Sequence, residues 1–183
     1  MKRFLISLLM TFSMGVLYAQ QNEVSLSQKG ENNGTRLTQN GTFSKVQAIQ
    51  DGETNTITLH QHNHSGTGPE AFINQKGDLN DVQASQTGAG NYMTISQMGN
   101  GNQVMAIQEA AENKLSLIQD GNGNMANIMQ TGGNNVLMGI NGDASARQIG
   151  TGNQLFLNQA GGHTVQVYQN GINNTITINQ SNP

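Results

Sequence analysis

Residues 113–121 read NKLSLIQDG, and the chain repeats the plan of this stretch many times. An asparagine, two leucines and a glutamine occupy every second position from Asn113 to Gln119, and Gly121 follows two positions later. A period of two is typical of a β-strand with one buried face, and glycine is typical of a tight turn because it tolerates positive φ. The stretch therefore predicts one strand followed by one turn.

The same glutamine, asparagine and glycine recur along the chain, mostly every eleven residues. A short fixed period indicates a stack of small units rather than a globular domain with a pocket. The repeated glutamines are Gln28, Gln39, Gln50, Gln61, Gln75, Gln86, Gln97, Gln108, Gln119, Gln130, Gln159, Gln169 and Gln180. The repeated asparagines are Asn33, Asn55, Asn80, Asn91, Asn102, Asn113, Asn124, Asn135, Asn153 and Asn174. The turn glycines are Gly30, Gly41, Gly52, Gly77, Gly88, Gly99, Gly121, Gly132, Gly150, Gly161 and Gly171.

Two units make one coil, with their strands on opposite walls. We count fifteen strand-like segments, of which one ends at Asn141 and a truncated one ends at Gln148. The prediction is an all-β fold, a β-solenoid of about seven two-strand coils that spans residues 20–183. At about 4.8 Å for each stacked strand, the solenoid is roughly 34 Å tall.

Two places in the chain break the period, and the stack is expected to be least regular there. The turn after Gln61 is lengthened, and the spacing from Asn141 to Gln148 is too short for a full unit. Single substitutions also occur in the turns. Asn63, Ala110 and Asp143 replace the turn glycine, whereas Ser44 and Ala146 replace the turn asparagine.

The inward amides predict hydrogen-bonded ladders. An isolated buried amide costs about 1–3 kcal/mol. In a stack, each Gln or Asn side chain can donate to the carbonyl of its copy one coil away, so a row of amides satisfies itself along the axis. We therefore expect the repeated glutamines and asparagines to form structural ladders.

The first residues have the pattern of an export signal. Lys2 and Arg3 precede an apolar run over residues 4–16, and Ala19 ends a plausible cleavage site. The apolar run is too short to span a bilayer comfortably, which favours a signal peptide at residues 1–19 over a membrane anchor. The chain has no cysteine and a formal net charge of −3, without a basic cluster. A nucleic-acid partner is therefore not expected.

The sequence offers no catalytic constellation and no cofactor motif, so the protein is not expected to be an enzyme. His60, His62 and His64 alternate around Gln61 and are weak candidates for binding zinc or copper. No carboxylate or cysteine supports them, which favours a solvated, polar loop entry. No metal or other cofactor is therefore predicted.

The outward positions turn apolar in the middle of the chain. A surface for lateral contact with further copies or with a partner subunit would account for this pattern, and so would the ordinary scatter of exposed apolar residues. The residues concerned are Met105, Ile107, Ile118, Met125, Met129, Val136, Met138 and Ile140.

The pattern Asn-x-φ-x-φ-x-Gln-x-Gly-x-x-Asn, with φ apolar, resembles the curlin repeat of bacterial curli fibres, and it covers the chain from Asn22 to Gln180. The resemblance implies a secreted subunit that polymerises into a cross-β extracellular fibre on the bacterial cell surface, with roles in adhesion and biofilm matrix. It implies as partners further copies of the chain, a related curlin subunit or nucleator, and outer-membrane export machinery. Curlins typically carry a segment between signal peptide and first repeat, whereas here the first strand begins almost at the cleavage site.

The resemblance fits a major fibre subunit and a nucleator equally well. The alternative function is that of a monomeric β-solenoid surface adhesin or binding protein.

Overall fold

The computed structural model describes residues 21–139 and 144–181, so the predicted signal peptide at residues 1–19 lies outside the described residues. The first strands are β1 (Glu23–Lys29), β2 (Gly34–Asn40), β3 (Lys45–Asp51), β4 (Thr56–His62), β5 (Glu70–Lys76), β6 (Asp81–Thr87), β7 (Tyr92–Met98) and β8 (Gln103–Glu109). They are followed by β9 (Lys114–Asn122), β10 (Met125–Thr131), β11 (Val136–Met138), β12 (Ala146–Thr151), β13 (Gln154–Ala160), β14 (Thr164–Gln166), β15 (Tyr168–Ile172) and β16 (Thr175–Ser181). Among the described residues there is no helix long and apolar enough to cross a membrane.

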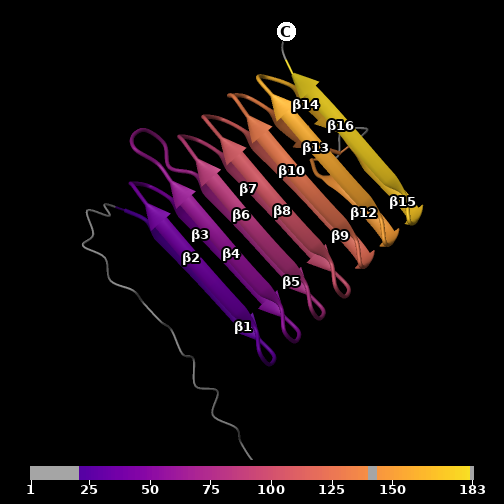
Figure 1. The fold of residues 1–183 in the computed structure, drawn as a ribbon. Helices are drawn as coiled ribbons and strands as arrows, with labels where there is room; N and C mark the ends of the chain where they lie inside the picture. Colours follow the sequence, from indigo (N-terminus) through magenta and orange to yellow (C-terminus); the bar gives the residue numbers. More distant parts are fainter. Residues whose placement is uncertain (1–20, 140–143, 182–183) are drawn as a thin grey trace, which may run out of the picture.

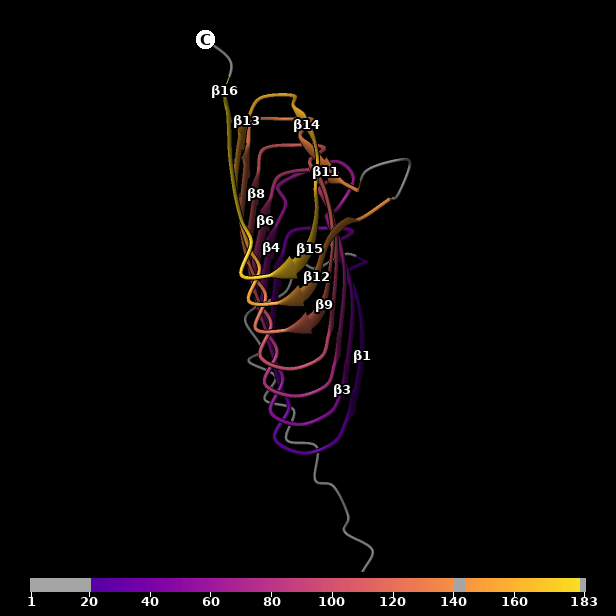
Figure 2. The ribbon, with the colours of Figure 1, turned by 90° about the vertical axis from the view of Figure 1, so that its right-hand side faces the viewer.

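The strands alternate between two parallel sheets, which form the walls of a β-solenoid (Figure 1). The β1 wall contains β1, β3, β5, β7, β9, β11, β12, β14 and β15, and the β2 wall contains β2, β4, β6, β8, β10, β13 and β16. Figure 2 shows the walls facing each other, joined at both edges by turns. The predicted all-β solenoid of about seven coils is confirmed.

The core is a thin aliphatic layer between the walls. Each regular strand turns two apolar side chains inward, as Met93 and Ile95 do in β7, and both are fully buried. Strands one coil apart pair in register, so Met93 lies beside Leu115 and Ile95 beside Leu117. Like side chains therefore stack on like along the axis, which explains how the chain builds a core with so few aromatic residues.

One rung of the β1 wall, meaning one strand position in the stack, corrects the sequence prediction. Both β11 and β12 pair with β9, because Leu137 lies opposite Leu115 and Gln148 lies opposite Gln119. The prediction of two separate strands ending at Asn141 and Gln148 is therefore wrong. β11 and β12 form a single rung, interrupted by residues 139–145.

The next rung also consists of two strands, since β14 pairs with β11 and β15 pairs with β12. Only Val167, which is buried, separates β14 from β15. With these two shared rungs, the nine strands of the β1 wall make as many rungs as the seven strands of the β2 wall. Ala146 is a fully buried core residue opposite Leu117, not the turn residue that the spacing predicted. Asn141 and Asp143 lie outside the described residues.

The lengthened turn after Gln61 leaves the stack in register. Pro69 occupies the place of the turn asparagine, and its carbonyl accepts a hydrogen bond from the Lys45 N–H at 2.9 Å. Gln61 still pairs with Gln86 in the next coil. Extra residues in a surface turn cost little when the paired strands on either side keep their partners.

Candidate functional site: amide ladders and open ends

Inward-facing glutamines form one continuous ladder along each wall. In each step, the Nε2 of one glutamine donates to the Oε1 of the glutamine in the following coil. In the β1 wall the series is Gln28, Gln50, Gln75, Gln97, Gln119, Gln148 and Gln169, with steps of 2.6–3.0 Å. In the β2 wall it is Gln39, Gln61, Gln86, Gln108, Gln130 and Gln159, with steps of 2.9–3.0 Å. Every step donates toward the C-terminal end, so the solenoid has a chemical polarity.

The second Nε2 hydrogen of each interior glutamine reaches the opposite wall. Gln97 donates to the Asp81 carbonyl at 3.2 Å, and Gln108 donates to the Tyr92 carbonyl at 3.1 Å. Both side chains are fully buried. Because both hydrogens and the oxygen have partners, these amides avoid the cost of an unpaired buried polar group.

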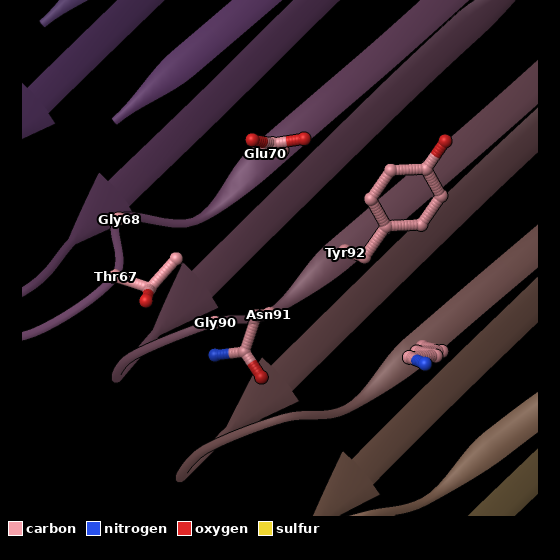
Figure 3. A pocket seen from close by; sticks show the side chains of 7 residues that line it. Thr67, Gly68, Glu70, Gly90, Asn91 and Tyr92 are labelled. Atoms are coloured by element: carbon pink, nitrogen blue, oxygen red, sulfur yellow. The ribbon is translucent and has the colours of Figure 1, made fainter. Parts of the chain in front are cut away.

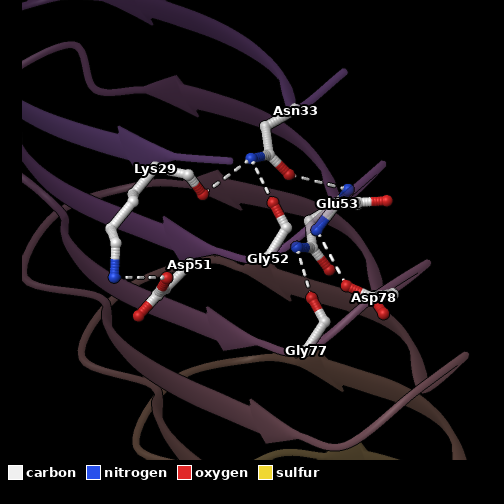
Figure 4. A network of polar contacts seen from close by, with 8 residues as sticks. Lys29, Asn33, Asp51, Gly52, Glu53, Gly77 and Asp78 are labelled. Atoms are coloured by element: carbon white, nitrogen blue, oxygen red, sulfur yellow. Dashed lines mark hydrogen bonds and ion pairs between the residues drawn. The ribbon is translucent and has the colours of Figure 1, made fainter. Parts of the chain in front are cut away.

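An asparagine ladder runs along the edge where the strands of the β2 wall begin. Each Oδ1 except that of the last residue accepts the backbone N–H of the asparagine in the next coil, at 2.9–3.1 Å. The series is Asn33, Asn55, Asn80, Asn102, Asn124, Asn153 and Asn174. The Nδ2 group ties the ladder to the turns: Asn33 donates to the Gly52 carbonyl at 2.8 Å, as Figure 4 shows.

The turn glycines allow successive turns to stack backbone on backbone. Gly77 has a φ of +106°, and a Cβ placed there would lie 2.3 Å from the Gly99 carbonyl oxygen. At Gly121 the φ is +121°, and the corresponding distance to the Gly150 oxygen is 2.0 Å. Positive φ is shared by the whole predicted set, which also includes Gly30, Gly41, Gly52, Gly88, Gly99, Gly132, Gly150, Gly161 and Gly171.

The opposite edge, where the strands of the β1 wall begin, has a less regular row. Its members are Asn22, Ser44, Pro69, Asn91, Asn113, Asn135 and His163. Asn113 and Asn135 continue the hydrogen-bond pattern, and the His163 N–H donates to Asn135 Oδ1 at 3.1 Å. Ser44 and Pro69 supply no amide, so this ladder is interrupted.

The predicted ladders left out four members of these rows. Asn22 was assigned only to the start of the first repeat and Gln148 only to the end of a truncated strand, whereas Pro69 and His163 were assigned to no row. Gln148 had a usable signal, because its separation of 29 residues from Gln119 equals the regular 22 plus an insertion. Pro69 and His163 had no such signal, since neither residue type resembles the asparagine that it replaces.

Gln180 is the predicted ladder residue that does not join its row. The Nε2 of Gln159 donates instead to the carbonyls of Val136 and His163, at 3.3 and 2.9 Å. The turn from Gln159 to His163 is one residue shorter than a regular turn. A regular turn also allows this kind of contact, since Gln148 donates to the Asn153 carbonyl at 3.2 Å and still donates to Gln169. In the described part of the chain, Gln180 Oε1 is buried without a hydrogen-bond partner.

The stack has two open ends with complementary chemistry. At the N-terminal end, the Oε1 atoms of Gln28 and Gln39 accept no hydrogen bond from any described residue. At the C-terminal end, Asn174 donates to Asn153 and to the Asn170 carbonyl, but its Oδ1 accepts no hydrogen bond from the described residues. In the end coils, four inward apolar side chains are only partly buried. These are Leu26, Leu37, Ile176 and Ile178.

The three candidate histidines do not form one cluster. The Nε2 atoms of His62 and His64 lie 2.8 Å apart, whereas His60 is exposed on the outer face of β4. Over residues 21–139 and 144–181, no group of three or more His, Cys, Asp or Glu side chains is placed to hold a metal ion.

A shallow hollow on the β1 wall measures about 400 Å³ and is lined in part by Glu70, Tyr92 and Lys114 (Figure 3). It is open to solvent, and no serine, cysteine or histidine lines it.

The fold and the ladders define the class of this protein as a β-solenoid built from self-pairing amide repeats. Residues 88–121 match the family model of the curlin associated repeat, which runs here from one turn glycine, Gly88, to another, Gly121. The curlin recognition made from the sequence is thereby confirmed for this segment. Searches of curated proteins and of solved structures gave no match. The repeat and the fold fit a curli-like subunit.

Proposed function

We propose that this protein is a secreted structural subunit that polymerises head-to-tail into curli-like amyloid fibres on the bacterial surface, where the fibres serve adhesion and biofilm matrix. The observation that carries the proposal is the complementarity of the two open ends. Each ladder step donates toward the C-terminal end, and the N-terminal end presents the matching acceptors, Gln28 Oε1 and Gln39 Oε1. Adding a second copy continues the same steps across the junction.

The register of the junction follows from the order of the walls. The chain leaves the last coil from β16, so an incoming copy places its β1 on β14 and β15, and its β2 on β16. Gln28 then lies opposite Gln169, and Gln39 lies opposite Gln180. Outside the solenoid, Glu23 and Lys29 of the incoming copy meet Thr164 and Asn170, which carry no charge, so like charges do not oppose each other.

The bare edges supply the driving force for assembly. Each end strand pairs with one neighbour only, as β16 does with β13 and β2 does with β4. Unpaired strand edges recruit further strands unless the fold covers them. Contact between the two different ends does not close on itself, so it generates a filament rather than a ring. The partly buried apolar side chains of the end coils become fully buried in the same step.

The proposal also includes further protein partners and a route of export. A related curlin subunit or nucleator presents the same kind of edge, and outer-membrane machinery delivers the subunit after removal of residues 1–19. A seeding assay between this chain and related subunits distinguishes a bulk subunit from a nucleator, because a nucleator shortens the lag phase at substoichiometric amounts.

A disulfide trap tests the junction, since the chain has no cysteine of its own. Thr38 and Asn179 face outward on β2 and β16 and become neighbours only across the proposed junction. Adjacent stacked strands lie about 4.8 Å apart, which is within the Cα separation that a disulfide spans. Oxidised fibres of the Thr38→Cys, Asn179→Cys variant are expected to yield a ladder of covalent oligomers on denaturing gels.

The control variant carries Thr38→Cys with Asn74→Cys, whose second cysteine is exposed on the other wall. It is expected to form fibres without the covalent ladder. Fibres of the first variant that stay monomeric after oxidation and denaturation would contradict head-to-tail stacking.

A further inference from the structure

We propose that His62 and His64 form a surface site for copper(II), which both imidazoles bind through Nε2. The two Nε2 atoms lie 2.8 Å apart, with ring planes at 89° and ring centroids 4.3 Å apart. Two unprotonated imidazole nitrogens repel each other at this distance, so a shared proton or a cation must lie between them. The pair is independent of the assembly ends, because it lies where β4 enters the lengthened turn.

The fold holds the two side chains in place through the residue between them. Asn63 is buried, and its Nδ2 donates to the carbonyls of Thr42 and Thr67 at 3.3 and 3.4 Å. Its Oδ1 accepts the Ser65 N–H at 3.3 Å. Because Asn63 is anchored inward, both neighbouring histidines lie on the outside of the turn, where their rings meet.

The separation of the nitrogens favours a square-planar ion over a tetrahedral one. For a metal–nitrogen bond of about 2.0 Å, adjacent corners of a square lie about 2.8 Å apart and corners of a tetrahedron about 3.3 Å apart. Copper(II) adopts square-planar or tetragonal geometry with imidazole ligands and binds more tightly than the other divalent first-row ions. Water completes the coordination, and His60, two residues earlier on the same face, is the nearest further imidazole along the chain.

Binding exchanges a proton for the metal. The neutral pair shares one hydrogen between its Nε2 atoms, so copper entry requires that this proton leaves, or moves to the Nδ1 position of the same ring. No redox step is involved in binding.

The test titrates copper(II) sulfate into the purified protein and its variants, and follows binding by calorimetry and by electron paramagnetic resonance. The wild type is expected to bind one copper ion more than the His62→Asn, His64→Asn double variant does. The paramagnetic resonance spectrum of this additional ion should show two nitrogen ligands in the equatorial plane. The double variant is expected to lose at least tenfold in affinity at this site. His163→Asn is the matched control, because His163 lies at the distant end of the stack, and it is expected to bind as the wild type does.

Two outcomes would overturn the proposal. One is equal copper binding by the wild type and the double variant, which would mean that the pair shares only a proton. The other is zinc binding as tight as copper binding, which would contradict the square-planar assignment. Circular dichroism of the double variant verifies that the solenoid is intact, as expected for side chains outside the core.

Discussion

At the residue scale, Gln108 shows how a buried amide contributes to this fold. Its Nε2 donates to Gln130 and to the Tyr92 carbonyl, and its Oε1 accepts from Gln86. Replacing Gln108 with Leu leaves the Gln86 donor and the Gln130 acceptor unpaired inside the core. We expect a loss of about 1–3 kcal/mol in the free energy of unfolding, measured by urea denaturation of freshly diluted, unpolymerised protein.

The control for this prediction is Gln47→Leu, because Gln47 is exposed on the outer face of β3. It is expected to change the free energy of unfolding by less than about 0.5 kcal/mol. Equal losses in the two variants would mean that the ladder has no special role in stability.

A second prediction at this scale concerns the turns. Gly121→Ala places a Cβ 2.0 Å from the Gly150 oxygen at a φ of +121°, whereas a Cβ at Gly101 meets no atom within 4 Å at a φ of +67°. Strain at such a conformation costs about 1–3 kcal/mol, and the clash adds to it. The thermal midpoint of Gly121→Ala should therefore fall well below that of Gly101→Ala. A smaller fall for Gly121→Ala would show that the turns do not stack as described.

At the element scale, the rung made by β11 and β12 tests whether the stability of the solenoid depends on strand register or on an unbroken strand. Deletion of residues 139–145 joins Met138 to Ala146 and restores a regular strand with Asn135, Leu137, Ala146 and Gln148 facing inward. We expect the deletion variant to keep its fold and to unfold at the same temperature or higher, because the chain is shortened and no residue of β11 or β12 is lost. The segment takes with it one hydroxyl contact, between Ser145 and Ser116 at 2.7 Å.

The control deletes the equally long segment 136–142, which removes β11 and with it the buried Leu137. It is expected to be clearly less stable by thermal circular dichroism. A loss of stability in the first deletion that matches the control would contradict the assignment of β11 and β12 to one rung.

The strands and their inward faces were largely predictable from the sequence, because every regular unit repeats the same residue pattern. Asn91, Met93, Ile95 and Gln97 alone predict the inward face of β7. The rung of β11 and β12 was not predictable by the same means. An insertion inside a strand produces the same spacing as a short unit, and only pairing with β9 tells the two apart.

The hydrogen bonding at the C-terminal end of the stack was also not predictable from the repeat pattern. A repeat predicts that Gln180 continues its row, but the Gln159 side chain donates to the Val136 and His163 carbonyls instead. Pro69 and His163 hold asparagine positions through backbone geometry alone. A pattern of residue types does not report such positions.

At the scale of the whole molecule, the two walls differ in outward chemistry. On the β2 wall, the outward residues of β10, β13 and β16 carry no charge, and Met105, Met125 and Met129 are 37–44% exposed. Ile107 pairs with Met129 on this face. The β1 wall instead carries charged pairs such as Lys29 with Asp51, at 3.3 Å (Figure 4).

We therefore expect fibres to bundle through the β2 wall, against the same face of a second fibre. Ile107→Thr with Met129→Thr should thin the bundles in electron micrographs without slowing elongation. Ile49→Thr, an exposed apolar residue on the charged β1 wall, is the control and should leave bundle width unchanged. Unchanged bundles in the double variant would place the lateral contact elsewhere.

Electron cryomicroscopy of fibres grown from the purified chain tests the central claim, that the ladders continue from one subunit into the next. The account predicts strands perpendicular to the fibre axis at about 4.8 Å spacing and one subunit for roughly every 34 Å. It also predicts that β16 of each subunit pairs in parallel with β2 of the next. Fibres whose subunits join through their outer walls, or a protein that stays monomeric at high concentration, would contradict it.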